Sequence, residues 1–308
     1  MLAIVLGLTQ KMQRTAAKVY GAVMANVAKR VPENVLGDFF VDSTCIDCDA
    51  CRQIAPAVFG QATETSYVSH QPEKSADRRA ALHDLLSCPT GSIGCLGDND
   101  AKAVMTDFPL LVEDPVYYCG FNSPKSFGGN SYFIRHPEGN WLIDSPKFIT
   151  PIVRRLKELG GVDFIFLTHR DDVADANRFA EHFGAKRIID RRELDSQPEA
   201  EIILEGDDPT HFGSDFTVIP TPGHSEGHCC LLFAERFLFT GDHLYWNRDD
   251  KQLAAFRDYC WYSWDAQRDS MRRLAQFSFE WILPGHGQRV RLPASTMAEQ
   301  MAQLVDRM

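Results

Sequence analysis

The stretch Thr221–His228, which reads Thr-Pro-Gly-His-Ser-Glu-Gly-His, predicts a tight turn that presents a histidine. Pro222 and Gly223 interrupt any regular element, so His224 is expected on a loop. This loop follows the apolar run Phe216–Pro220, which is typical of a buried strand. The sequence therefore predicts a histidine held at the carboxyl end of a rigid strand.

Three other apolar runs end on a histidine or an aspartate in the same way. They are Phe164–Thr168 before His169-Arg170-Asp171-Asp172, Phe237–Thr240 before Gly241-Asp242-His243, and Trp281–Leu283 before Pro284-Gly285-His286. Imidazole and carboxylate are the donors that a divalent metal requires, and Gly or Pro lets the backbone turn away to leave space for an ion. Any one of these residues alone is compatible with an ordinary polar strand end, but four in this order indicate a metal site.

The order and local sequence of these motifs resemble the metallo-β-lactamase superfamily over about residues 112 to 300. The matching pieces are Gly129–Ile134, Leu142–Asp144, Leu167–His169, Thr221–His228, Thr240–Asp242 and Leu283–His286. The resemblance implies two mixed sheets sandwiched between helices, in an αββα arrangement. It also implies a hydrolase that uses a metal ion.

The expected ligands come from matching that superfamily's His-x-His-x-Asp-His motif to this chain. His169 matches the first histidine, Asp171 replaces the second, and Val173 and Ala174 stand where the family has Asp and His. Outside this motif, the other residues that match family ligands are His224, Asp242 and His286. The resemblance thus implies a first metal position formed by His169, Asp171, His224 and Asp242, and a second that keeps only Asp242 and His286.

Asp172 and Asp175 are less certain ligands for the second position. A helix that starts near Asp172 would place both on one face. The alternative is that they are acidic residues at a helix N-terminus, where the helix dipole favours negative charge. A site rich in carboxylate suits iron or manganese at least as well as zinc. Flavodiiron proteins, which belong to this superfamily, also have a carboxylate in the second motif position, but they retain the following Asp and His.

Residues beside the expected ligands are candidates for catalysis. Asp242 could orient a water molecule, and His228 or His243 could orient a ligand or donate a proton. A structural hydrogen-bonding role for either histidine is the alternative. Aromatic residues cluster after Asp242 and could line a substrate pocket or pack in the core: Tyr245, Trp246, Tyr259, Trp261, Tyr262 and Trp264, with Arg257 among them.

A second metal motif lies upstream. Cys45, Cys48 and Cys51 form a C-x2-C-x2-C motif, and Cys88 is followed by Pro89. Three thiolates on one loop and a remote fourth can bind an iron–sulfur cube, and this arrangement resembles a single-cluster bacterial-type ferredoxin. Four cysteines favour a [4Fe–4S] cluster over a three-iron cluster, with a zinc site as the alternative. Cys95 and Cys119 match no motif and are interpreted as packing residues.

Composition limits the remaining possibilities. The chain has 308 residues, a formal net charge of −10 and nine cysteines. The charge argues against nucleic-acid binding, the chain has no apolar run long enough to span a membrane, and the cysteine pattern favours a reducing compartment. Residues 1–37 predict an amphipathic helix, which is a targeting segment, a membrane-surface helix or a docking helix. The protein is therefore expected in the cytoplasm, or in an organelle stroma if the segment is a targeting peptide. A ferredoxin-like domain is expected at 38–100, a connector at 101–115 and the metallo-β-lactamase-like domain at 116–308.

Three functions are compatible with this organisation. The first is hydrolysis of an ester, thioester or amide in a small-molecule substrate by metal-bound hydroxide, with one or two zinc, iron or manganese ions. The second is iron-dependent oxidoreduction, in which the cluster passes electrons from a redox partner to the metal site. The third is a redox sensor or binding protein whose metal site has lost catalysis.

Overall fold

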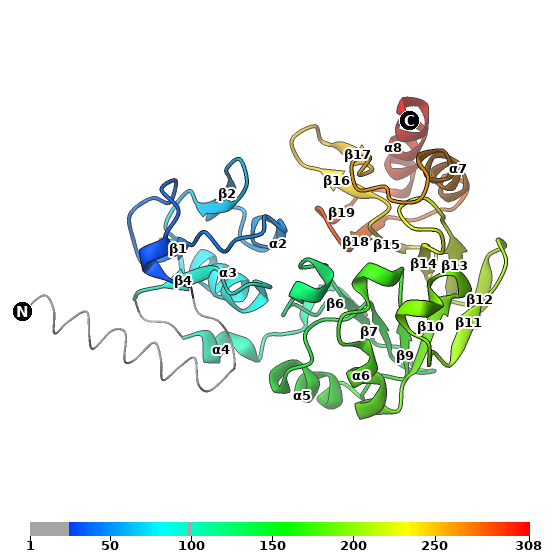
Figure 1. The fold of residues 1–308 in the computed structure, drawn as a ribbon, viewed down its shortest axis with the longest axis horizontal. Helices are drawn as coiled ribbons and strands as arrows, with labels where there is room; N and C mark the ends of the chain where they lie inside the picture. Colours follow the sequence, from blue (N-terminus) through cyan, green and yellow to red (C-terminus); the bar gives the residue numbers. More distant parts are fainter. Residues whose placement is uncertain (1–24, 98–99) are drawn as a thin grey trace, which may run out of the picture. The chain divides into compact units, whose positions relative to one another are not determined.

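The computed structural model describes residues 25–97 and 100–308, which divide into two compact units between Met105 and Thr106 (Figure 1). Most of the predicted N-terminal helix falls in residues 1–24 and lies outside the described residues. Of the rest of that segment, Val27–Lys29 forms a single 3₁₀ turn, η1.

The first unit is a small α+β fold around a shared apolar core. Two antiparallel pairs, β1 with β4 and β2 with β3, pack against the helices. The elements are β1 (Phe39–Val41), α2 (Ala50–Ile54), β2 (Phe59–Gln61), β3 (Ser66–Val68), α3 (Ser75–Ser87), β4 (Ile93–Cys95) and α4 (Ala101–Met105). Cysteines of the C-x2-C-x2-C motif lie at the start of α2 and just before it, and Cys88 caps the C-terminus of α3.

The expected connector at 101–115 has regular structure instead. Its first part is α4 of the first unit, and its second part contains β5 (Leu110–Glu113), the edge strand of a sheet in the second unit. Asp114-Pro115 is the turn between β5 and β6 and is not a domain boundary. The hydrophobic pattern of this segment is short, so sequence alone did not reveal its strand pairing.

The second unit contains two facing sheets. The seven-stranded sheet has the order β11-β10-β9-β8-β7-β6-β5, and the six-stranded sheet has the order β12-β13-β14-β15-β18-β19. The first is formed by β5, β6 (Val116–Tyr118), β7 (Tyr132–Ile134), β8 (Trp141–Ile143), β9 (Phe164–Phe166), β10 (Lys186–Asp190) and β11 (Ile202–Leu204). The second is formed by β12 (Thr210–Phe212), β13 (Phe216–Pro220), β14 (Cys229–Phe233), β15 (Phe237–Gly241), β18 (Trp281–Pro284) and β19 (Val290–Arg291).

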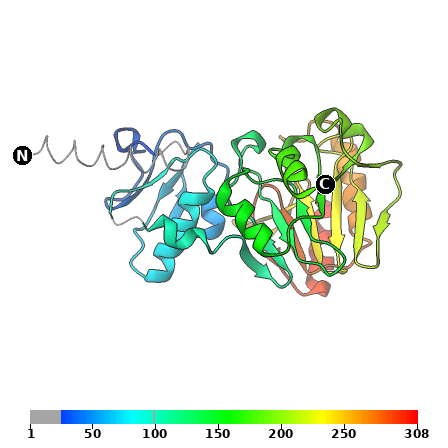
Figure 2. The same ribbon diagram turned by 90° about the horizontal axis from the view of Figure 1, so that it is seen from below.

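Helices cover the outer faces of both sheets, so the unit is the predicted αββα sandwich (Figures 1 and 2). They are α5 (Thr150–Glu158), α6 (Ala176–Phe183), α7 (Trp264–Leu274) and α8 (Ala294–Arg307), with 3₁₀ turns η2 (Pro124–Ser126), η3 (Arg170–Asp172) and η4 (Arg191–Ser196) and a hairpin of β16 (Tyr245–Asn247) and β17 (Gln252–Ala254). Met271 of α7 and Met301 of α8 pack on Ile282 of the six-stranded sheet. Between the sheets, the ring of Trp141 stacks on that of Phe216 at a centroid distance of 4.2 Å.

All four runs predicted as strands before ligands are strands: β9, β13, β15 and β18. Within each sheet, the strands that carry neighbouring ligand loops are parallel, β8 with β9 and β15 with β18. Parallel strands end at the same edge, so the loops that follow them gather there. Within the described parts of the chain, no helix is both long and apolar enough to cross a bilayer.

Candidate metal centres

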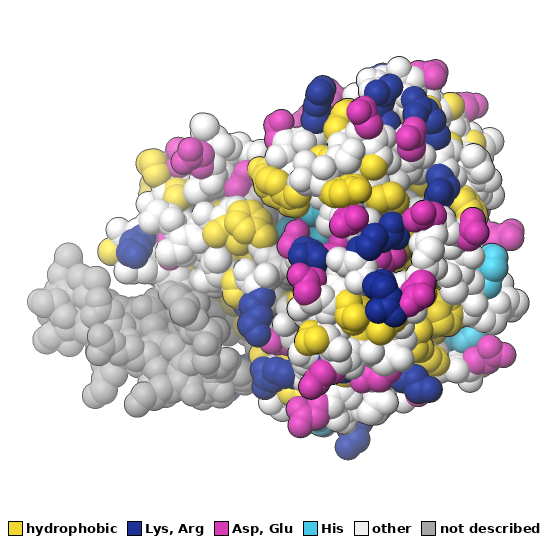
Figure 3. All heavy atoms as spheres, turned by 45° about the vertical axis from the view of Figure 1, so that its right-hand side comes forward, with side chains coloured by type: hydrophobic (Ala, Val, Ile, Leu, Met, Phe, Trp, Pro, Cys, Tyr) yellow, Lys and Arg dark blue, Asp and Glu magenta, His cyan; other side chains and the backbone are white. Residues whose placement is uncertain are grey.

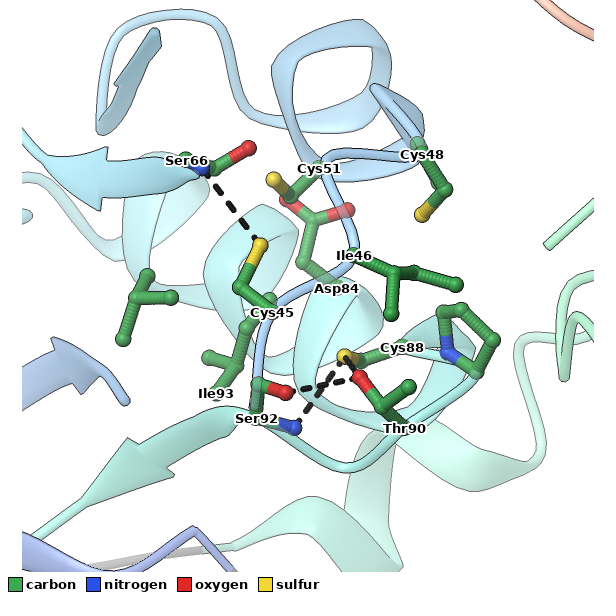
Figure 4. Close-up of a pocket in the computed structure, with 13 residues that line it drawn as sticks. Cys45, Ile46, Cys48, Cys51, Ser66, Asp84, Cys88, Thr90, Ser92 and Ile93 are labelled. Atoms are coloured by element: carbon green, nitrogen blue, oxygen red, sulfur yellow. Dashed lines mark hydrogen bonds between the residues drawn. The ribbon is translucent and has the colours of Figure 1, made fainter. Parts of the chain in front are cut away.

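The cysteine site of the first unit is a buried pocket. Cys45, Cys48, Cys51 and Cys88 line it together, and Figure 4 shows their side chains around a common space. Backbone N–H groups donate to two of the sulfurs, from Ser66 to Cys45 Sγ at 3.4 Å and from Ser92 to Cys88 Sγ at 3.3 Å. Such hydrogen bonds stabilise thiolate ligands, so the four residues fit an iron–sulfur cluster.

The loop that carries three of these cysteines is held in an unusual conformation. Asp47 and Asp49 both have positive φ, at 54° and 67°. The buried Arg52 guanidinium donates to both carboxylates and to Ser66 Oγ. This ion-pair network pins a backbone that l-residues seldom adopt.

Burial keeps the thiols of Cys48 and Cys51 protonated when no iron is bound. Desolvation, followed by the nearby Cys88, raises the pKa of Cys48 to about 12, and burial also raises the pKa of Cys51. The carboxylate of Asp84 lines the same pocket and adds to the effect at Cys51. Binding of iron would have to displace these protons, because only the thiolate ligates a metal.

In the second unit, the predicted ligands meet at the carboxyl ends of their strands. His169 follows β9, His224 lies on the loop after β13, Asp242 follows β15 and His286 follows β18. Backbone hydrogen bonds tie these loops across the two sheets, from Cys229 N to Thr168 O and from Asn130 N to Gly285 O. We call His169, Asp171, Asp172, His224, Asp242 and His286 the strand-end donor set.

Ligand atoms of three of these residues, His169, His224 and Asp242, lie within 4.8 Å of one another, and Asp171 lies beside both histidines. His224 Nε2 lies 3.4 Å from Asp171 Oδ2, and His169 Nε2 lies 3.8 Å from Asp171 Oδ2. Asp242 Oδ2 lies 3.8 Å from the Nε2 atoms of both histidines. Ligands about 2.1 Å from a tetrahedral ion are separated by about 3.4 Å, so the atoms of His169, His224 and Asp242 would have to move closer together to bind one.

Buried donor atoms without hydrogen-bond partners support this assignment. His169 Nε2, Asp242 Oδ1 and both carboxylate oxygens of Asp172 are buried and accept or donate no hydrogen bond among the described residues. An unsatisfied buried polar atom is costly, so a run of them at one place indicates a missing ligand. Thr168 Oγ1 contacts His169 Nδ1 at 3.0 Å, which leaves Nε2 directed to the other donors.

Asp172 lies beside Asp242 and His286, whereas Asp175 is directed elsewhere. Ligand atoms of Asp172, Asp242 and His286 lie within 4.8 Å of one another. A Cβ atom on Gly129 or Gly285 would lie only 2.6 or 2.7 Å from the Asp172 carboxylate oxygens, so these glycines make room for it.

Asp175 instead caps α6. It binds Lys125 Nζ at 2.7 Å and the backbone N–H of Phe148 at 2.8 Å. The expectation that Asp172 and Asp175 share a helix face is wrong, because η3 ends at Asp172 and α6 begins only at Ala176. The same break buries Asp172, which therefore is not a solvated charge at a helix N-terminus.

Burial sets the ionisation of this site. It lowers the pKa of His169 to about 4, so the imidazole is neutral, as a metal ligand must be. It raises the pKa of Asp172 well above the usual range, with the nearby carboxylate of Asp242 as the next cause. His224 lowers the pKa of Asp171. Carboxylates so close together without counter-charge favour occupation by a cation.

His228 and His243 lie behind the donor set. Both are fully buried, and their rings stack at 5.2 Å, with His169 on the other side of His228 at the same distance. His228 Nδ1 contacts Thr221 Oγ1 at 2.9 Å. This location favours support of His169 over proton donation to a substrate.

The aromatic residues after Asp242 differ in burial. Tyr245 and Trp246 are half-buried, whereas Tyr259, Trp261 and Tyr262 are exposed.

Two acidic residues of the site received no role from sequence. Asp144, after β8, accepts hydrogen bonds from the N–H and hydroxyl of Thr168. Glu193 accepts from Gly227 N at 2.8 Å and from Arg170, and so joins the loops of His169 and His224. Asp144 ends a quoted family motif, which was a usable signal. Glu193 lies in no motif and is recognisable only from its contacts.

Comparisons with family models agree with this architecture. Residues 125–286 match the model of the metallo-beta-lactamase superfamily, and residues 41–95 match the 4Fe-4S single cluster domain of ferredoxin I. The first match spans more than half of the chain, and the chain belongs to the metallo-beta-lactamase superfamily, with a single-cluster ferredoxin domain before the superfamily domain.

Individual relatives cover less of the chain. Hydroxyacylglutathione hydrolases of Citrobacter koseri and Salmonella paratyphi B are each 30% identical over 128 residues, which is 40% of this chain and 51% of each relative. The chain thus spans about half the length of these curated relatives. A superfamily protein from Sulfolobus tokodaii is 16% identical over 62% of this chain and 85% of its own, with a TM-score of 0.45. The metallo-beta-lactamase of Bradyrhizobium japonicum is 16% identical over 64% and 90%, with a TM-score of 0.46.

Proposed function

We propose that this chain hydrolyses an ester, thioester or amide of a small molecule at the strand-end donor set. The observation that carries the proposal is the group of donor atoms from His169, His224 and Asp242, which lie within 4.8 Å of one another, with Asp171 Oδ2 beside both histidines. The name of the matched relatives, hydroxyacylglutathione hydrolase, supports an acyl thioester as the substrate class.

Each donor residue has a defined part in this proposal. A divalent ion held here would lower the pKa of a water molecule and polarise a carbonyl. His169 and His224 would hold the first ion, while Asp172 and His286 would hold a second. Asp242 belongs to both groups, so it would fix the spacing of the two ions and accept a hydrogen bond from the attacking water.

The donor atoms of this site suit harder divalent ions as well as zinc. Three of the six residues are carboxylates: Asp171, Asp172 and Asp242. One of them, Asp171, stands where the superfamily motif has a histidine. Oxygen donors suit manganese and iron at least as well as zinc. We therefore expect manganese or iron to compete with zinc at this site.

A second candidate function is iron-dependent oxidoreduction. A cysteine pocket that fits a [4Fe–4S] cluster precedes the donor set in the same chain, and the carboxylate-rich donors are compatible with iron. In that case the cluster would receive electrons from a redox partner and pass them to the second centre. In the hydrolase, the cluster would instead report redox state or stabilise the fold.

Metal analysis with paired assays tests these alternatives. Protein purified anaerobically would be assayed for metals, for hydrolysis of acyl thioesters including a hydroxyacylglutathione, and for consumption of oxygen or nitric oxide with a reductant. Metal-dependent hydrolysis that survives oxidation of the cluster is expected. Turnover of oxygen or nitric oxide that requires reduced cluster would favour the oxidoreductase, and a protein that binds no second metal and turns over neither substrate would contradict both.

A further inference from the structure

Exposed aromatic side chains gather at one place on the second unit. Phe127, Tyr259, Trp261 and Tyr262 are 59%, 58%, 65% and 52% exposed, and they are the exposed large aromatic residues among those that the structure describes. We call these four residues the aromatic rim. Figure 3 shows a face on which hydrophobic side chains gather beside a small area of histidine. An exposed apolar cluster of this kind costs solubility and marks a binding surface.

One side of the aromatic rim is fixed to the loop of His224. The backbone N–H groups of Trp261 and Tyr262 both donate to His224 O, at 2.9 and 3.1 Å. The Trp261 ring lies 6.3 Å from the His224 ring and 6.0 Å from that of Tyr259. Ser263 N also donates to Gly223 O, so the segment is anchored before α7 begins. The exposed rings are therefore held beside a predicted ligand.

Phe127 approaches the donor set from the other metal position. Its ring lies 6.4 Å from that of His286. The loop around it is fixed by the buried Asn122, whose side chain donates to Gly128 O at 2.7 Å, and by Asn130 N, which donates to Gly285 O at 2.7 Å. Since His224 and His286 each lie 3.8 Å from Asp242 Oδ2, the aromatic rim borders both metal positions.

Two cations near the ligand loops are paired with carboxylates, and a third lies near an aromatic ring. Lys125 Nζ binds Asp175, and Arg170 binds Glu193 and Asp195. The guanidinium of Arg257 lies 5.5 Å from the Trp264 ring centroid. The exposed charged group within the donor set is the carboxylate of Asp171, which is half-exposed. This arrangement favours recognition by apolar contact over recognition of an anionic group.

We propose that the aromatic rim binds an aryl or long-chain acyl group and thereby selects neutral, apolar acyl esters or thioesters. This inference rests on the proposed hydrolase function. In the reaction, water adds its oxygen to the acyl carbon, the bond from that carbon to sulfur or oxygen breaks, and the departing thiol or alcohol takes the proton. A carboxylic acid and the free thiol or alcohol form, with no oxidant consumed.

A matched substrate series tests the selectivity. The metal-loaded protein would be assayed with acetyl, octanoyl and phenylacetyl thioesters of one neutral thiol, and with a thioester of equal size that carries a carboxylate on its acyl group. We expect the octanoyl and phenylacetyl compounds to have kcat/KM values about 10- to 100-fold above that of acetyl, since apolar pocket contacts give factors of this size. Equal values, or preference for the anionic compound, would overturn the inference.

Variants locate the effect in the aromatic rim. Trp261→Ala should lower the ratio of phenylacetyl to acetyl kcat/KM about tenfold, and Trp261→Phe should restore most of it. Leu111→Ala is the matched control, because Leu111 is a 61% exposed hydrophobic residue of the edge strand β5, and it should leave the ratio unchanged. A ratio that Trp261→Ala leaves unchanged would also overturn the inference.

Binding separates failure of the inference from failure of the proposed function. If no thioester is hydrolysed, the function fails, but a non-hydrolysable phenylethyl thioether can still be titrated. We expect the phenylethyl thioether to quench tryptophan fluorescence, and we expect this quenching to be lost in Trp261→Phe. The methyl thioether should bind more than tenfold more weakly in the same titration. Hydrolysis without chain-length preference would leave the function standing and contradict the inference alone.

Discussion

The cysteine pocket and the strand-end donor set are assembled in opposite ways. Three of the four cysteines lie within Cys45–Cys51, on one loop whose shape is held by a local network around Arg52. The donor set takes its residues from loops after β9, β13, β15 and β18, which are spread over more than 100 residues of sequence. A local loop can fix its ligands by itself, whereas the second centre exists only when both sheets are packed.

The two centres also differ in donor chemistry. The pocket offers thiols, which suit an iron–sulfur cluster, and the donor set offers imidazole and carboxylate, which suit harder divalent ions. Each site should therefore be filled independently of the other.

Removal of one ligand from each centre should give complementary losses. Cys48→Ala should abolish the visible absorbance of the cluster and most of its iron, while the second centre keeps its metal. His224→Ala should do the reverse, because the two variants remove ligands from separate units. Metal analysis with absorbance spectra of anaerobically purified protein would measure both. Loss of both centres in either single variant would refute the independence of the two units.

Asp172 and Asp175 provide a matched pair within one short segment. Asp172→Asn should weaken binding of the second ion by more than about tenfold, since even an outer-shell partner of a ligand is worth about 10- to 100-fold in affinity. Asp175→Asn should leave affinity unchanged, because its carboxylate binds Lys125 and Phe148 N. Metal titration by calorimetry would compare them. Similar affinities in the two variants would exclude Asp172 as a ligand.

The smallest effect concerns pH and the metal-free second unit. Burial raises the pKa of Asp144 from 3.8 to about 8. Between these values the folded state holds a proton on Asp144 that the unfolded state has released, so the contribution of Asp144 to stability should fall as pH rises from about 4 to about 8. A loss on the order of 1 kcal/mol would lower Tm by about 2–4 °C.

Bound metal should reduce the change of stability with pH, because a cation next to Asp242 stabilises the ionised carboxylate of Asp144. All five tryptophans lie beyond residue 105, so tryptophan fluorescence reports unfolding of the second unit. Melting at pH 5 and pH 8, with chelator or with manganese, gives the comparison, and Asp144→Asn is the control without a titrating group. Buried His169 has a lowered pKa and adds the opposite trend below about pH 6.5, so the two proteins are compared at each pH. A wild-type protein that, relative to Asp144→Asn, is more stable at pH 8 than at pH 5 would contradict the expected sign.

Sequence patterns were sufficient wherever the signal was local or periodic. The runs before His169, His224, Asp242 and His286 are strands, as predicted. The structure of the segment 101–115 was not predictable in this way. Its elements α4 and β5 are short, and β5 is defined by its pairing with β6.

The sequence alone determined which chemical groups were available: four motif cysteines on one side, and histidines and aspartates at strand ends on the other. Only the tertiary structure decided between Asp172 and Asp175, since three residues of backbone turn one carboxylate toward Asp242 and the other toward Lys125. It also decided that Trp261 is exposed beside His224 and that Glu193 joins two ligand loops. Side-chain direction and long-range contact depend on how the sheets pack, and no local pattern encodes them.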